Sequence, residues 1–79
     1  MYLDTSINPT FVVELAAFFK ALSEPARLSI VLALSDECRP VSDVAAATSL
    51  PQPLVSHHLR ILRDTGVARP DRRGASVYY

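Results

Sequence analysis

The polar side chains between Pro51 and Gly66 are of the types that bind nucleic acid. On a helix with about 100° per residue most of them fall on one side, together with Pro53. We call this side the outer arc, and its residues are Gln52, Pro53, Ser56, His57, Arg60, Arg63 and Asp64. Amide, hydroxyl and imidazole groups can exchange hydrogen bonds with base edges, and guanidinium groups bind phosphate or guanine. The outer arc therefore predicts a surface that reads DNA. The alternative is an ordinary amphipathic helix with a solvated side.

The opposite arc of this helix is apolar and predicts a side that faces a core. Its residues are Leu54, Val55, His58, Leu59, Ile61 and Leu62. Adjacent residues of a helix point about 100° apart, so His57 and His58 cannot both bind one metal ion. We expect His57 to face DNA and His58 to be a core histidine with a hydrogen bond to the backbone.

The charges of the chain are divided between its two parts. Residues 1–49 contain three basic and six acidic side chains, whereas residues 50–79 contain five basic and two acidic ones. All five basic residues of the second part are arginine, which suits phosphate and guanine recognition. A positive region of this kind indicates a polyanionic partner even though the formal net charge is zero.

Other chemistry has little support in the sequence. There is no acid–base pair at a plausible spacing and no glycine-rich phosphate loop among only two glycines, so we expect no enzyme. The single cysteine, Cys38, cannot form an internal disulfide and fits a reducing, cytoplasmic location. Cys38 is a weak candidate metal ligand, and an inert, partly exposed thiol is the better interpretation. No apolar run approaches the roughly 20 residues that span a bilayer, so we expect no membrane partner.

Helix-start signals divide the rest of the chain. Three residues with capping side chains each precede a helical pattern: Asn8, Ser23 and Ser42. Gly66 can end the last helix. The predicted helices are residues 9–21, 25–35, 43–48 and 51–64, the second of them buried on most of its circumference. We expect a flexible arm over residues 1–8 and one domain over residues 9–79.

The end of the chain changes to a strand-like pattern. Residues 67–69 and 76–79 are short β-prone runs, and the turn composition between them includes Arg72 and Arg73. These runs predict a two-stranded hairpin with a basic tip that contacts the DNA backbone or a minor groove. The expected fold class is mainly α with a small β-hairpin, a winged helix-turn-helix of four helices plus a two-stranded wing.

The first helix carries a large apolar load for so small a domain. Four residues recur on one side of it and form what we call the phenylalanine stripe: Phe11, Leu15, Phe18 and Phe19. We expect much of the stripe to pack on the core and the surplus to contact a second subunit.

Three segments carry a family resemblance. Residues 19–28, Phe-Lys-Ala-Leu-Ser-Glu-Pro-Ala-Arg-Leu, resemble the opening signature of the ArsR-type winged-helix repressors, and residues 51–67 resemble their recognition-helix signature. Arg72-Arg73-Gly74 with Val77-Tyr78-Tyr79 is similar to their wing. The resemblance implies a homodimeric transcriptional repressor that an inducer releases from operator DNA. No cofactor is evident, and a metal ion is implied by the resemblance alone. The rival interpretation is a winged-helix protein–protein interaction module without direct DNA readout.

The sequence departs from the family pattern at three places. Where the arsenic sensors have Cys-Val-Cys-Asp, this chain has Pro40-Val41-Ser42-Asp43, without a thiol. Pro51 stands where a capping serine is usual, and Ser49 with Gln52 could form a substitute capping box. The sequence ends at Tyr79, before the C-terminal helix that completes the dimer in the family. We therefore expect the phenylalanine stripe to carry more of any dimer contact.

Overall fold

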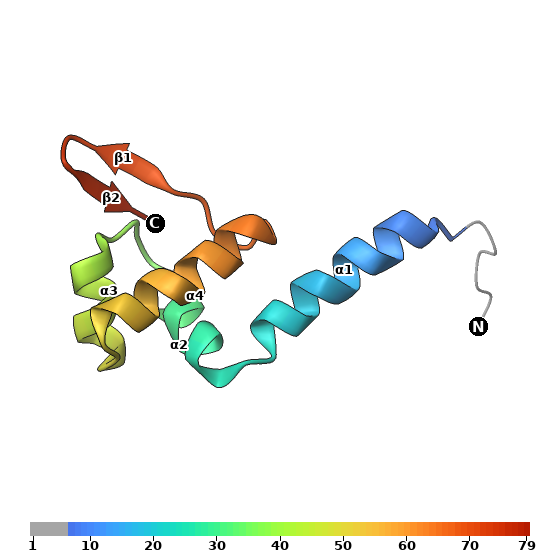
Figure 1. Cartoon of the computed structure of the whole chain (residues 1–79), viewed down its shortest axis with the longest axis horizontal. Coiled ribbons are helices and arrows are strands. Elements are labelled where there is room, and N and C mark those ends of the chain that lie inside the picture. The colour runs from blue at the N-terminus through green and yellow to red at the C-terminus, as the bar shows by residue number, and fades with distance from the viewer. Residues whose placement is uncertain (1–6) are drawn as a thin grey trace.

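The computed structural model describes residues 7–79 and has four helices followed by a two-stranded antiparallel hairpin (Figure 1). The elements are α1 (Pro9–Leu22), α2 (Pro25–Ala33), α3 (Val41–Thr48), α4 (Gln52–Asp64), β1 (Asp71–Arg73) and β2 (Ser76–Tyr78). This order confirms the predicted fold class. Residues 1–6 of the predicted flexible arm lie outside the described residues. Figure 1 shows α1 extending away from a body that the other elements form.

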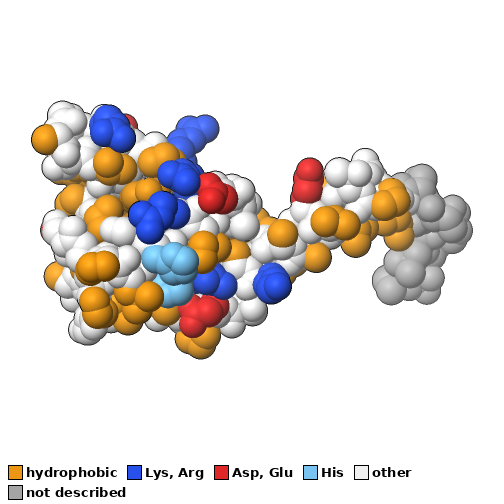
Figure 2. Space-filling model, viewed as in Figure 1, with side chains coloured by type: hydrophobic (Ala, Val, Ile, Leu, Met, Phe, Trp, Pro, Cys, Tyr) orange, Lys and Arg blue, Asp and Glu red, His pale blue; other side chains and the backbone are white. Residues whose placement is uncertain are grey.

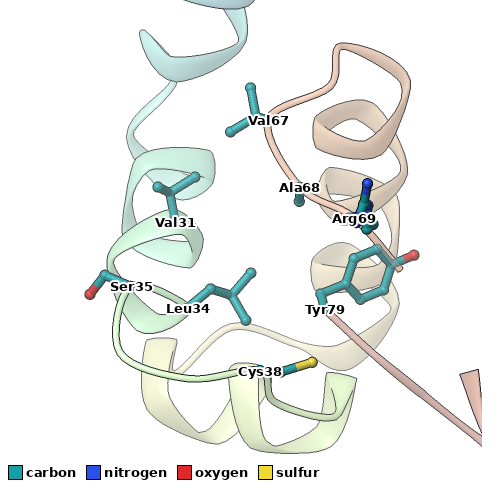
Figure 3. Close-up of a pocket in the computed structure, with 8 residues that line it drawn as sticks. All are labelled: Val31, Leu34, Ser35, Cys38, Val67, Ala68, Arg69 and Tyr79. Atoms are coloured by element: carbon teal, nitrogen blue, oxygen red, sulfur yellow. The ribbon is translucent and has the colours of Figure 1, made fainter. Parts of the chain in front are cut away.

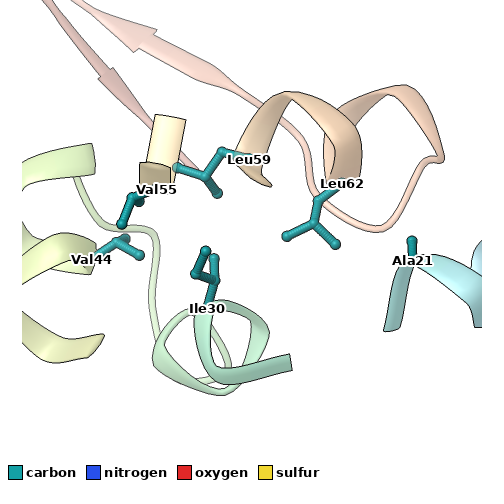
Figure 4. Close-up of a cluster of buried hydrophobic side chains, with 6 residues drawn as sticks. All are labelled: Ala21, Ile30, Val44, Val55, Leu59 and Leu62. Atoms are coloured by element: carbon teal, nitrogen blue, oxygen red, sulfur yellow. The ribbon is translucent and has the colours of Figure 1, made fainter. Parts of the chain in front are cut away.

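A small core joins the helices (Figure 4). Its buried apolar side chains are Ala21, Ile30, Val44, Val55, Leu59 and Leu62. Half of them come from α4, as the apolar arc of residues 51–66 predicts. Leu54 of that arc is nevertheless 39% exposed, so its assignment to the core is wrong.

Helix α2 is buried on one side only. Ile30 is fully buried at the centre of the core, but Leu28 and Leu32 are exposed. The prediction that this helix is buried on most of its circumference is therefore wrong, because no element within residues 7–79 covers the side that carries these two leucines. The phenylalanine stripe of α1 is also largely uncovered, and Ala21 is the only buried residue of α1.

Side chains cap the first two helices. The Oδ1 atom of Asn8 accepts a hydrogen bond from the backbone N–H of Thr10 at 2.9 Å, which confirms the predicted cap. At the start of α2 the cap is Glu24, whose carboxylate accepts from the N–H of Arg27 at 3.1 Å. The prediction that Ser23 caps α2 is therefore wrong. Its hydroxyl instead donates to the carbonyl of Lys20 at the end of α1.

The next two helices begin without a side-chain cap. Pro40 precedes α3, so Ser42 lies inside that helix and is not its cap. Pro51 precedes α4, and the predicted capping box does not form. Ser49 instead ends α3 in the left-handed conformation, with φ of 58°.

The end of α4 has the hydrogen bonds of a Schellman motif. Gly66 has φ of 81°, its N–H donates to Arg63, and the N–H of Val67 donates to Leu62 at 2.8 Å. The N–H of Ala68 also donates to Leu62, and the side chains of residues 67 and 68 pack on the core. The strand predicted for residues 67–69 is therefore wrong, because these residues complete the helix end.

The hairpin is shorter than predicted, and a third segment joins it. Arg72 pairs with Val77, and the turn has Gly74 at φ of 61°, as two-residue hairpin turns with a leading glycine require. Arg72 and Arg73 thus lie on β1 and not at the tip. On the other side, Arg39 and Tyr79 exchange two backbone hydrogen bonds of 2.9 Å. The strands predicted from the sequence do not include Arg39.

Candidate nucleic-acid interface

The outer arc of α4 lies open to solvent. Gln52, Pro53, His57, Arg60 and Arg63 are exposed, and Ser56 is half-buried. Figure 2 shows histidine and basic side chains gathered on the face that α4 crosses in the same view. The structure thus places the predicted site residues of α4 together on one accessible surface.

A groove connects the outer arc to the wing. It has a volume of about 290 Å³ and is lined by Pro40, Val41, Ser42, Gln52, Ser56, Ala75, Ser76 and Val77. The lining contains an amide and three hydroxyl groups, which can each accept and donate hydrogen bonds. Gln52 and Ser56 of the outer arc therefore share one concave surface with the start of α3 and with the hairpin.

The four predicted site arginines differ in how their charges are used. The Nε and Nη2 atoms of Arg63 each lie 3.0 Å from Oδ1 of Asp64. The Nε atom of Arg73 donates to Asp71 at 2.9 Å, and its guanidinium lies 4.4 Å from the ring centroid of Tyr78. The hydrogen bond to Asp71 raises the pKa of Arg73. Both arginines are thus partly neutralised by neighbours in their own elements.

Arg60 and Arg72 keep their charges available. Neither guanidinium forms a hydrogen bond or an ion pair within the part of the chain that the structure describes. Both side chains are exposed, Arg60 on α4 and Arg72 on β1. Since exposed ion pairs hold their partners only weakly, Arg63 and Arg73 can still contribute, but Arg60 and Arg72 are the stronger phosphate-binding candidates.

The adjacent histidines have different environments, as their positions on α4 predict. His57 is exposed, whereas His58 is only 8% exposed and lies on the core side. The predicted backbone partner of His58 is wrong: its Nδ1 atom lies 3.4 Å from Nη1 of Arg27 on α2. Burial lowers the pKa of His58, Arg27 and His57 lower it further, and Glu24 opposes them.

The thiol of Cys38 does not belong to a metal-binding cluster among the described residues. Within residues 7–79 no three histidine, cysteine or acidic side chains come close enough to hold one. Cys38 is exposed and lines a shallow depression with apolar side chains such as Val31, Leu34 and Val67 (Figure 3).

No helix of the described chain has the length and apolar content to cross a bilayer.

These elements define a winged helix-turn-helix domain. Helix α3, the tight turn at Ser49–Pro51 and α4 form the helix-turn-helix, and β1 and β2 form the wing. Residues 24–69 match the family described as "Bacterial regulatory protein, arsR family". The chain belongs to this family.

Similar proteins agree with this assignment. The chain is 45% identical over 60 residues to the HTH-type transcriptional repressor SmtB of Mycobacterium tuberculosis, covering 76% of this chain and 44% of that protein. It is 41% identical over 66 residues to the HTH-type transcriptional regulator NmtR of the same organism, covering 84% of this chain and 55% of the relative. The chain thus spans about half the length of the curated relatives it matches.

Solved structures share the whole fold. One is the homodimeric winged helix-turn-helix DNA-binding domain of a possible ArsR-family regulator from Mycobacterium bovis. It has a TM-score of 0.87 and 28% identity, and the match covers 100% of this chain and 73% of that one. Another is NolR from Sinorhizobium fredii, with a TM-score of 0.81 and 28% identity. That match covers 100% of this chain and 79% of the other.

The lowered pKa of His58 predicts a pH-dependent stability. In the unfolded chain this imidazole has an ordinary pKa near 6.5. Below that pH the unfolded state therefore binds more protons than the folded state. The free energy of unfolding should be at its full value above about pH 7 and fall as pH decreases, by up to about 1.4 kcal/mol per pH unit from this group.

Urea unfolding of the wild type and of His58→Leu at several pH values measures this contribution. The variant should have a flatter dependence on pH below about pH 6.5, since leucine does not titrate. His57→Leu, the same substitution at the exposed neighbour, should keep most of the wild-type slope, because burial is the main cause of the lowered pKa of His58. Equal slopes in the wild type and His58→Leu would show that the buried imidazole does not set the pH dependence.

Proposed function

We propose that this protein is a sequence-specific DNA-binding transcriptional repressor that acts as a homodimer in the cytoplasm and is released from its operator by an inducer. The observation that carries the proposal is the exposed outer arc of α4 beside a polar groove shared with the wing. In a winged helix-turn-helix the second helix enters the major groove with its N-terminal half toward the bases.

The roles of the site residues follow from their chemistry and placement. Gln52 can bond adenine through both of its amide atoms, and Ser56 and His57 can accept or donate to base edges. Pro53 offers an apolar contact beside them. Arg60, one turn further along α4, and Arg72 on the wing can each bind a phosphate of the DNA backbone. Arg63 and Arg73 add positive charge once DNA competes for their present partners.

The proposed dimer depends on α1. Phe11 and Phe19 are 59% and 61% exposed, and Leu15 lies between them on the same side of the helix. Exposed apolar surface of this extent on one helix is typical of a protein interface. We infer that the phenylalanine stripe packs against the partner subunit. The neighbour from Mycobacterium bovis is homodimeric, which supports a dimer but does not identify its surface.

The first test separates phosphate contacts from base contacts. Arg60→Ala and Arg72→Ala should each weaken binding to all sequences. Each should also reduce the slope of the logarithm of the association constant against the logarithm of the salt concentration by about one. Fluorescence anisotropy with a labelled operator from the promoter of the protein's own gene, at several salt concentrations, measures both effects. Lys20→Ala, which removes the same charge from α1, should leave the slope unchanged. Unaltered affinity in both arginine variants would contradict the proposed footprint and favour a protein-binding module.

Base contacts should appear as altered specificity. Gln52→Ala and Ser56→Ala should each relax the preference at one base position, because a good base contact contributes about 1–3 kcal/mol of discrimination. Selection of binding sites from a random library by each variant identifies the positions. A uniform loss of affinity on every sequence would instead assign these side chains to the DNA backbone.

The dimer contact can be tested without DNA. Phe19→Glu should raise the dimer dissociation constant at least about tenfold, because burial of a phenylalanine contributes roughly 1.5–3 kcal/mol. Sedimentation equilibrium measures the constant. Val13→Glu is a matched control, since Val13 is 68% exposed and lies on the opposite side of α1 from the stripe. If both variants dimerise like the wild type, the stripe is not the interface.

A further inference from the structure

One arginine side chain connects three helices. The Nε atom of Arg27, on α2, donates a hydrogen bond to the carbonyl oxygen of Ala21 in the last turn of α1 at 2.7 Å. Its Nη1 atom lies 3.4 Å from Nδ1 of His58 on α4. The backbone N–H of the same residue donates to the carboxylate of Glu24 at 3.1 Å. Arg27 therefore links the end of the projecting helix to the helix that carries the outer arc.

Few other contacts hold α1 at its angle to the body. Ala21 is its only buried residue, and Ser23 and Glu24 alone separate it from α2 (Figure 1). The guanidinium is well suited to this position because it is planar and can donate in two directions at once. Without it, α1 would be held by the short turn and by one small apolar contact.

We propose that the contact between Arg27 and His58 sets the orientation of α1 relative to α4, and through it the separation of the two recognition helices in the dimer. The second half of this statement rests on the proposed function. Two half-sites on one face of a duplex are about 34–36 Å apart, so a changed angle at α1 would misplace one recognition helix. Arg27 and His58 are thus positioning residues that need not touch DNA.

The contact depends on the protonation state of the imidazole. Nδ1 of His58 can accept from Arg27 only while it carries no proton, because a guanidinium has no acceptor. Protonation would set two donors and two positive charges against each other. Glu24 favours the charged imidazole, whereas burial, Arg27 and His57 disfavour it. The contact is therefore intact at neutral pH and is lost in acid.

The test measures the orientation of α1 directly. Spin labels are attached in a Cys38→Ser background at Glu14→Cys on α1 and at Ala46→Cys on α3, which packs on α4. Dilution with unlabelled chain removes distances between subunits, and pulsed electron paramagnetic resonance gives the distance distribution. At about pH 7.5 the otherwise unaltered chain should give one narrow distribution. His58→Leu, which removes the acceptor but keeps an apolar filling, should widen it at least about twofold.

Two further variants keep the test decisive if His58→Leu folds poorly. Arg27→Lys keeps the charge but lacks the planar group whose separate nitrogen atoms face Ala21 and His58, so it should widen the distribution as well. His57→Leu is the matched control on the same helix and should leave the width unchanged. A narrow distribution at an unaltered distance in both His58→Leu and Arg27→Lys would overturn the proposal.

Acid supplies an independent arm of the experiment. At about pH 5 the spin-labelled chain that keeps His58 should show the widened distance distribution. His58→Asn, whose amide oxygen can replace Nδ1 as acceptor and does not titrate, should stay narrow at both pH values. A narrow distribution for the chain with His58 in acid would contradict the role of the imidazole.

The distances are measured without DNA, so the outcome separates this inference from the proposed function. Widened distributions in a protein that binds no operator would support the positioning role and contradict the repressor. Operator binding with unaltered distance distributions would support the repressor and contradict the positioning role.

Discussion

The fold depends on the packing of Ile30 against one side of α4. Ile30, Val55, Leu59 and Leu62 are all fully buried, and α3 adds Val44 to the same cluster (Figure 4). A domain of this size buries a modest share of its surface, so a core of so few side chains has little redundancy. The helix that holds the body together is also the helix that presents the outer arc. Burial of the apolar side of α4 consequently determines which way the outer arc faces.

The wing is positioned by backbone hydrogen bonds as well as by the packing of Tyr79 against the core. An isolated two-stranded hairpin is at best marginally stable in water. Here Arg39 and Tyr79 exchange two hydrogen bonds just before α3 begins, so β2 is attached to the start of the helix-turn-helix. This attachment places Ser76 and Val77 in the same groove as Gln52 and Ser56. The polar surface that we assign to DNA is therefore built from segments that are distant in sequence.

Helix α1 is organised differently from the body. It buries only Ala21 and leaves most of its phenylalanine stripe exposed, while Leu28 and Leu32 of α2 are exposed as well. Such apolar exposure is consistent with an interface that a second subunit completes. Because so little packing holds α1, the hydrogen bonds of Arg27 to Ala21 and His58 have a large share in its orientation. The projecting helix α1 and the helix that presents the outer arc are thereby joined through one guanidinium.

The sequence by itself determined what is local to each element. Helical periodicity predicted the two arcs of α4 and the opposite environments of His57 and His58, and Gly66 marked the helix end. Only the tertiary structure decided that Leu54 and Leu28 stay uncovered, that Arg39 pairs with Tyr79, and that the partner of His58 is Arg27. The physical reason is that periodicity specifies the direction of a side chain relative to its own axis. Which distant residue lies in that direction depends on how the elements pack.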